Sequence, residues 1–165
     1  YSLNTSNLEA LKRIIYFFAT SQPGSVNINR LAGSLEKDFT TIAEYVQILR
    51  DTGLLRFLLQ NKQGHALVRD AEKIYLDNPN LLCALNEEVG KEPLVGLIRE
   101  LFVISNLQNA NYHVFFSKEA DIECDGSLFE IGGKSKTGGK GCLVKDDILI
   151  GDSKTIPLFL FGFLS

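Results

Sequence analysis

Apolar residues recur at helical spacing near the start of the chain. Residues 7–21 carry apolar side chains three and four positions apart, which predicts a helix with one buried face. Ser6 and Glu9 form an S-x-x-E capping box, a pattern that satisfies free backbone N–H groups at the start of a helix. After the Pro23–Gly24 break, the same spacing predicts a short second helix over 28–35.

The next segments predict one more helix and then a hairpin. The third helix covers 41–51, and Thr41 is its predicted N-cap. Apolar runs at 54–59 and 66–68 are separated by a polar turn, which is the pattern of a β-hairpin. Three short helices followed by a hairpin is the order of a winged helix-turn-helix. In this order, 41–51 is the recognition helix and 54–69 is the wing.

The second half of the chain has a different period. A predicted strand at 73–77 is followed by a helical turn at 81–85 and a strongly amphipathic helix over 94–107. Further short apolar segments typical of strands lie at 112–116, 120–124, 127–131, 142–144 and 156–161. The fold class is therefore α+β, with a winged-helix domain at 1–72 and an α/β domain at 73–165.

Composition and charge exclude several classes of protein. The chain is 45% hydrophobic and 22% charged, and its formal net charge is −3, so the bulk charge does not indicate a nucleic-acid or membrane-surface binder. The longest apolar run, 156–164, is far shorter than the roughly 20 residues of a membrane-spanning helix, and we interpret it as a buried strand. Three widely spaced cysteines give no disulfide framework and no CxxC metal site. We expect a cytoplasmic protein without membrane contact.

Basic side chains in the first half offer a limited DNA-binding surface. Residues 1–78 contain nine Lys and Arg and eight Asp and Glu, a net of +1. A DNA-binding module usually needs several Lys or Arg contacts to phosphate groups. The candidates for such contacts are Arg30, Lys37, Arg50, Arg56, Lys62 and Arg69. Two interpretations stay open, a DNA-binding module and a protein-docking spacer, and the second is favoured.

The second half combines carboxylates and a lysine in an order typical of metal-dependent phosphodiester hydrolysis. Glu100 lies on the long predicted helix, and Asp121 and Glu130 belong to strands. Lys134 follows Glu130 after two glycines. Carboxylates on neighbouring elements hold Mg²⁺, which lowers the pKa of a bound water, and a lysine orients that water or offsets phosphate charge. These four residues are the candidate catalytic group, with Asp121 and Glu130 as metal ligands.

Six segments of the chain together resemble a known family. They are DTGLL at 51–55, EKIYLDNPNL at 72–81, IRELFV at 98–103, EAD at 119–121, LFEIGGKSK at 128–136 and IPLFLFGFL at 156–164. In this order they resemble the C-terminal half of bacterial and archaeal AAA-type ATPases. The start at Tyr1 and the absence of Met also predict that the chain is a piece of a longer protein.

The resemblance implies both a fold and a set of partners. It implies a winged helix followed by an α/β restriction-endonuclease-like, PD-(D/E)XK domain with a mixed sheet. ATP would bind only to the upstream ATPase domain, which is also the expected partner. The resemblance places Glu100, Asp121, Glu130 and Lys134 in the nuclease-like site, with Mg²⁺ as the metal and DNA as a further partner.

Two departures from the family's pattern predict a degenerate site. In the E-x-K motif the lysine stands two residues after the glutamate, so that both point to one face of the strand, but here that position is Gly132. The segment between Lys134 and Leu143 is also shorter than the usual crossover to a parallel strand, so either the usual helix has been lost or residues are missing. The alternatives are an active Mg²⁺-dependent DNA endonuclease and a non-catalytic DNA-binding module. The sequence leaves the oligomeric state open.

Overall fold

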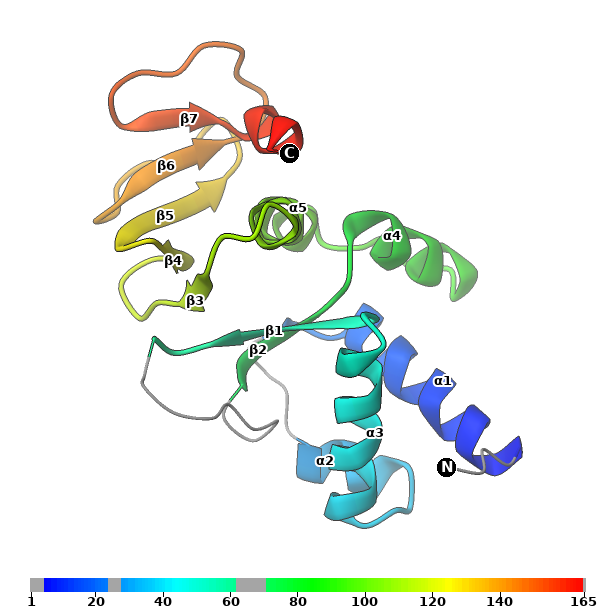
Figure 1. The fold of residues 1–165 in the computed structure, drawn as a ribbon. Coiled ribbons are helices and arrows are strands. Elements are labelled where there is room, and N and C mark those ends of the chain that lie inside the picture. Colours follow the sequence, from blue (N-terminus) through cyan, green and yellow to red (C-terminus); the bar gives the residue numbers. More distant parts are fainter. Residues whose placement is uncertain (1–4, 24–27, 62–70, 165) are drawn as a thin grey trace. The chain divides into compact units, whose positions relative to one another are not determined.

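The chain forms two compact units. The computed structural model describes residues 5–23, 28–61 and 71–164. One unit consists of Tyr1–Leu59 with Gly64–Pro93, and the other of Gln60–Gln63 with Leu94–Ser165. Each unit combines helices with one sheet, and the sheet of the second unit is mixed (Figure 1). The predicted combination of helices with a mixed sheet is therefore confirmed.

The first unit packs four helices and two strands around one core. Its helices are α1 Thr5–Thr20, α2 Ile28–Ser34, α3 Phe39–Asp51 and α4 Pro79–Glu88. The helical periodicity places Ile14, Leu31 and Val46 inward, and each is at most 1% exposed. The buried amide of Asn86 on α4 donates to the carbonyl of Ala19 on α1 at 2.8 Å, so a satisfied polar group joins these two helices.

The third helix begins earlier than the sequence pattern predicted. Asp38 is the N-cap, and its carboxylate accepts hydrogen bonds from the backbone N–H of Thr41 at 2.9 Å and from the Thr41 hydroxyl at 2.7 Å. Thr41, the predicted cap, is instead the third residue of α3. The hydrogen bond from the Thr41 side chain, followed by that from its backbone, lowers the pKa of Asp38 because both favour the charged carboxylate.

The two strands of the first unit change the predicted domain boundary. Strand β1, Leu55–Leu59, pairs antiparallel with β2, Ala71–Leu76. The predicted boundary between residues 72 and 73 falls inside β2, whereas this pairing keeps β2 and the following α4 in the first unit, which extends to Pro93. The predicted strand at 66–68, with most of the remaining wing, lies outside the described residues.

The second unit begins with a helix and continues with strands. Its elements are α5 Val95–Asn109, β3 Val114–Phe116, β4 Ile122–Cys124, β5 Ser127–Gly132, β6 Cys142–Lys145, β7 Thr155–Pro157 and the 3₁₀-helix η3 Leu158–Phe163. The sheet order is β3-β4-β5-β6-β7, antiparallel from β3 to β5 and parallel from β5 to β7. Helix α5 packs against β5 and β3 and contacts η3 (Figure 1). The buried sheet residues include Ile122 and Val144.

Two segments of this unit differ from a standard α/β arrangement. The parallel strands β5 and β6 are joined by 133–141, a crossover of turns and irregular backbone with no helix. The apolar run predicted as a strand at 156–161 is a strand only at Thr155–Pro157 and then becomes η3. In η3, Leu158 and Phe161 are buried three positions apart, which matches three residues per 3₁₀ turn. None of the described helices is long and apolar enough to cross a membrane.

Candidate functional site

Three charged side chains of the second unit form one cluster. The ammonium of Lys136 lies 3.0 Å from Oε2 of Glu130 and 3.5 Å from Oδ2 of Asp121. The side chains of Glu130, Asp121 and Lys136 are 14%, 23% and 33% exposed, respectively, so water reaches the cluster only in part. We call these three residues the Asp–Glu–Lys cluster. Two of the four predicted catalytic residues, Asp121 and Glu130, belong to it.

Strand β5 positions both carboxylates of the cluster, Asp121 through hydrogen bonds and Glu130 as one of its own residues. Oδ2 of Asp121 accepts a hydrogen bond from the backbone N–H of Ile131 at 2.7 Å, and the N–H of Asp121 donates to the carbonyl of Phe129 at 3.1 Å. Glu130 stands between these two residues on β5. Because successive strand side chains alternate between faces, Glu130 points to the face opposite Phe129 and Ile131. The carboxylates thus converge on one face of the sheet.

The lysine of the cluster is Lys136, and the predicted Lys134 is not part of it. A turn after β5 is closed by a hydrogen bond from the Lys136 N–H to the Gly133 carbonyl at 2.9 Å. The stem of Lys136 then lies over Gly132, where an added Cβ would come within 2.8–2.9 Å of three Lys136 carbons. Lys134 is exposed, and its carbonyl accepts from the ammonium of Lys145 at 3.4 Å. Sequence reasoning missed Lys136 because strand alternation does not describe a chain that folds back over two glycines.

The neighbouring carboxylates hold Lys136 in its charged form. Burial by itself would lower the pKa of Lys136, but the hydrogen bond to Glu130 and the negative charges of Asp121 and Glu130 outweigh it. The pKa of Lys136 is therefore raised above the ordinary lysine value. The cluster as a whole carries two negative charges and one positive charge.

The crossover loop covers part of the cluster. Gly139 has a φ of 111°, and a Cβ added there would lie 2.6 Å from Cγ of Glu130. The loop backbone therefore packs directly on the Glu130 side chain, at a position that only glycine fits. Beyond it, Lys140 pairs with Glu119 at 3.2 Å, both well exposed. The glycine-rich segment thus brings Lys136 to the carboxylates and packs on one of them.

Helix α5 carries the predicted Glu100 and, next to it, Arg99. Glu100 is half-buried on α5, and no three His, Cys, Asp or Glu side chains among the described residues could together hold a metal ion. Its neighbour Arg99 pairs with Asp146 at 3.0 Å and with Asp147 at 3.5 Å. The Arg99 guanidinium also lies against Gly133, 3.2 Å from the position of an added Cβ. Arg99 therefore joins α5 to the segments that follow β5 and β6.

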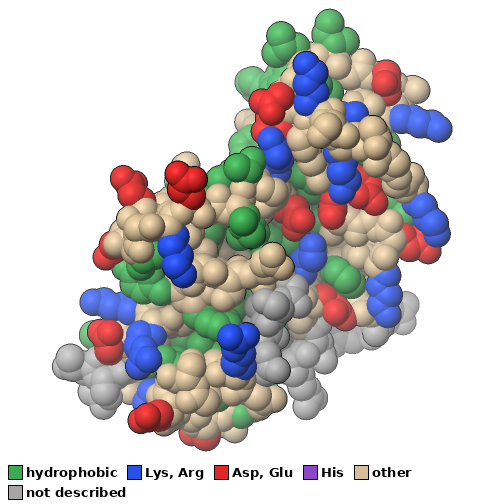
Figure 2. All heavy atoms as spheres, turned by 180° about the vertical axis from the view of Figure 1, so that it is seen from behind, with side chains coloured by type: hydrophobic (Ala, Val, Ile, Leu, Met, Phe, Trp, Pro, Cys, Tyr) green, Lys and Arg blue, Asp and Glu red, His purple; other side chains and the backbone are tan. Residues whose placement is uncertain are grey.

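Two of the predicted DNA-contacting cations of the first unit, Arg50 and Arg56, are engaged in other contacts. Arg56 pairs through Nη2 with Oδ1 of Asp77 at 2.6 Å, and Arg50 lies over the Phe57 ring at 4.8 Å from its centroid. Arg30 is exposed and Lys37 is half-buried. The remaining two candidates, Lys62 and Arg69, lie outside the described residues. On the face shown in Figure 2, Lys and Arg side chains are interspersed with Asp and Glu side chains.

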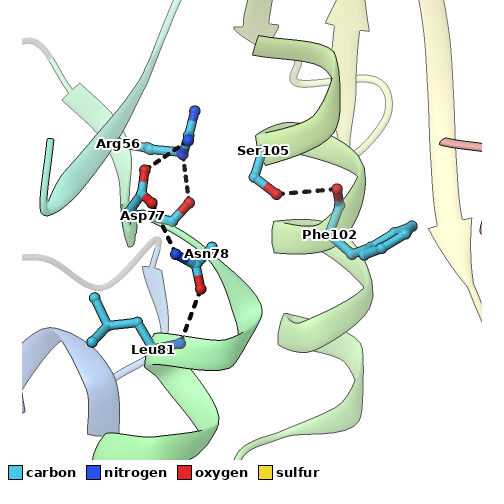
Figure 3. Close-up of polar contacts among 6 residues, drawn as sticks. All are labelled: Arg56, Asp77, Asn78, Leu81, Phe102 and Ser105. Atoms are coloured by element: carbon cyan, nitrogen blue, oxygen red, sulfur yellow. Dashed lines mark hydrogen bonds and ion pairs between the residues drawn. The ribbon is translucent and has the colours of Figure 1, made fainter. Parts of the chain in front are cut away.

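The Arg56–Asp77 pair belongs to a longer polar chain at the start of α4. Asn78 donates from its amide to Oδ2 of Asp77 at 2.9 Å and accepts from the backbone N–H of Leu81 at 3.0 Å (Figure 3). Arg56 also donates from Nε to the Asp77 carbonyl. The same figure shows a separate bond within α5, where the hydroxyl of Ser105 donates to the carbonyl of Phe102 at 3.2 Å. Arg56 therefore has a structural role between β1 and α4.

The comparisons with known proteins bear mainly on the first unit. Residues 2–92 match the family described as a domain of unknown function (DUF8612), and this match ends beside Pro93, where the first unit ends. No curated protein and no solved structure matched the chain. Because the match covers more than half of the 165 residues, the chain belongs to the DUF8612 family of domains of unknown function.

Proposed function

We propose that the chain is a C-terminal regulatory and interaction region of an AAA-type ATPase, and that its second unit is a PD-(D/E)XK nuclease-like domain without cleavage activity. The six sequence segments that resemble such ATPases support the first part. The order of α5, three antiparallel strands and a parallel β6 supports the second. In this proposal the first unit is a winged helix used for protein docking, and ATP binds only to the upstream domain.

The observation that carries the proposal is the position of the Lys136 ammonium. It lies within ion-pair distance of both carboxylates that a catalytic Mg²⁺ would need, Glu130 at 3.0 Å and Asp121 at 3.5 Å. Oδ2 of Asp121 also accepts the N–H of Ile131. Mg²⁺ requires near-octahedral oxygen coordination and gives up its own water reluctantly, so it must displace this ammonium to bind both groups. The ammonium of Lys136 thus offsets one of the two negative charges at the place where the metal would bind.

One observation favours a second candidate, an active Mg²⁺-dependent DNA endonuclease. Lys136 extends over Gly132, the position that the motif lysine would occupy two residues after Glu130. In an active site, Asp121 and Glu130 would hold Mg²⁺, which lowers the pKa of a bound water, and Lys136 would offset charge on the phosphate. The two candidates differ in whether a divalent ion can replace the ammonium between the carboxylates.

Metal binding and DNA cleavage, measured on the whole chain, separate these candidates. Calorimetry with millimolar Mg²⁺ or Mn²⁺ is expected to give no binding, and single-stranded, duplex and branched DNA are expected to stay intact with either ion. Glu130→Ala, purified in parallel, controls for contaminating nuclease. Metal-dependent cleavage that disappears in both Glu130→Ala and Lys136→Ala but persists in Lys134→Ala would establish the endonuclease instead.

The same purified protein is used to test the DNA-binding alternative. The whole chain is titrated against labelled duplex DNA at two salt concentrations, and fluorescence anisotropy is recorded. For a protein-docking unit we expect no binding at physiological salt. Binding that weakens steeply as salt rises would reveal phosphate contacts and would favour a DNA-binding module.

A further inference from the structure

The second unit contains a pocket that the Asp–Glu–Lys cluster does not use. Its volume is about 360 Å³, and its walls come from α5, from β4, β5 and the turn between them, and from β7 and η3. The apolar part includes Leu107, Phe129, Ile156 and Leu160. Phe129 points to the sheet face opposite Glu130, so the pocket and the cluster lie on different faces of β5. The pocket is therefore a separate site.

The charge that lines this pocket is negative. Of the residues that line it, all within the described part of the chain, Asp125 alone carries a charge. Asp125 is exposed at the turn between β4 and β5 and precedes Ser127, a further polar lining residue. Burial, and after it the negative charge of Asp125, raises the pKa of the Cys124 thiol, which also lines the pocket. The carboxylate thus acts electrostatically on the pocket wall.

The apolar lining is also open to solvent in part. Leu160 on η3 is 44% exposed, although it lines the pocket, and the neighbouring Phe159 and Phe163 on the same helix are 44% and 75% exposed. Large apolar side chains left accessible beside a concave surface are typical of a binding site. A pocket of this volume is at the lower end of small-ligand sites and holds one or two large side chains.

We propose that this pocket binds a segment of a partner polypeptide in which a large apolar side chain stands next to a Lys or Arg. The apolar side chain fills the space between Leu107, Phe129 and Leu160, and the basic side chain pairs with Asp125 at the rim. The single negative charge of the lining selects a basic neighbour over an acidic one. This inference concerns a second site and does not depend on the chemistry of the cluster.

Two capped tetrapeptides test the proposal on the whole chain. Acetyl-Ala-Phe-Lys-Ala-amide and acetyl-Ala-Phe-Glu-Ala-amide are titrated into ¹⁵N-labelled protein, and the amide shifts of Cys124 and Ser127 are followed. The lysine peptide is expected to bind at least about threefold more tightly, which corresponds to one partly exposed ion pair. Equal affinity for the two peptides, or no shifts at these amides with either, would overturn the proposal.

Matched variants and a small amine complete this test. Asp125→Asn is expected to remove the preference for the lysine peptide, whereas Glu119→Gln, which removes an exposed acid outside the pocket lining, should preserve it. Phenethylamine carries the same ring and charge without a peptide backbone. If it binds as tightly as the lysine peptide, the occupant is a small amphiphilic amine and the polypeptide proposal is wrong.

The Cys124 thiol provides an independent readout. The chain has three cysteines, and replacing Cys83 and Cys142 by Ser leaves Cys124 as the single thiol. Cys124 is buried and its pKa is raised, so its reaction with a thiol reagent is slow and depends on access through the pocket. Its reaction rate with a thiol reagent is expected to fall when the lysine peptide is added and to change little with the glutamate peptide. A rate that responds equally to both peptides would contradict the proposal. Should the double variant not fold, the wild-type titration still decides.

Discussion

At the scale of single residues, the charge balance of the second unit depends on Lys136. Its ammonium is the positive charge between Asp121 and Glu130, and its stem occupies space that a side chain at position 132 would fill. An ion pair that remains one-third exposed contributes little by itself, about 0–1 kcal/mol. Its removal has the added effect of leaving two neighbouring carboxylates without the charge that offsets their repulsion.

Lys136→Met tests this balance, because methionine keeps an apolar stem over Gly132 and removes the charge. At neutral pH we expect the free energy of unfolding of the second unit to fall by roughly 1 kcal/mol, measured by urea titration. Lys134→Met is the matched control, since Lys134 is exposed and outside the cluster, and it should change stability by much less. Equal effects of the two variants would contradict a specific role for Lys136.

The same pair of proteins gives a pH dependence with a definite sign. The folded-state pKa of Lys136 is raised, so its contribution to stability is fully present below the ordinary lysine value of 10.5 and is lost as the pH rises through the folded pKa. The stability difference between wild type and Lys136→Met should therefore shrink in the alkaline range above 10.5. A difference that stays constant through this range would show that the ion pairs do not contribute.

At the scale of elements, the start of α4 links a helix to the sheet of the first unit. Asn78 caps α4 through the backbone N–H of Leu81, and Asp77 connects the cap to Arg56 on β1. The N-terminal N–H groups of a helix have no partner within the helix, so a side-chain acceptor at the cap is stabilising. One short polar chain thus stabilises the helix start and the end of the strand pair together (Figure 3).

Asn78→Ala is expected to lower the free energy of unfolding by about 1 kcal/mol, because it removes the acceptor at the cap and the donor to Asp77. Chemical denaturation followed by circular dichroism measures this change. Asn80→Ala is the control, since Asn80 is an exposed residue in the first turn of the same helix. A loss of similar size in Asn80→Ala would assign the effect to helix propensity and not to the cap.

The sequence pattern predicted which helices and strands form better than it predicted the residues at which they begin and end. The apolar periodicity located α2 and α5 to within a few residues, because each helix buries one face in its own unit. It did not separate Asp38 from Thr41 as the cap of α3, since both residue types accept backbone N–H groups. It also assigned η3 to a strand, because a short, wholly apolar run fits a buried strand and a buried helix equally.

At the scale of the whole molecule, strand pairing decides where the first unit ends. The change of period after residue 72 suggested a new domain, but β2 pairs with β1 and α4 packs against α1. The family match at 2–92 ends one residue before this unit does. We expect this unit to have its own core, because α1 and α3, which carry the buried Ile14 and Val46, pack against other helices and strands of the same unit.

Truncation tests this boundary. A fragment of residues 1–93 is expected to unfold cooperatively in urea, with circular dichroism typical of mixed helix and strand. A fragment of residues 1–72 loses most of β2 and all of α4, exposes their apolar partners, and should be largely unfolded. Cooperative unfolding of the shorter fragment would place the boundary at residue 72 after all.

The sequence by itself determined most of the order of helices and strands, the bulk charge and two members of the cluster, because periodicity and residue type are local properties. Asp121 and Glu130 were identified from the order of carboxylates and a lysine along the chain, and in the structure Asp121 directly precedes β4 and Glu130 lies on β5. Only the tertiary structure decided that Lys136, not Lys134, meets them, and that Arg99 joins α5 to the segments after β5 and β6. These outcomes depend on how the chain turns over its glycines and which strands pair, and such contacts between distant residues leave no period in the sequence.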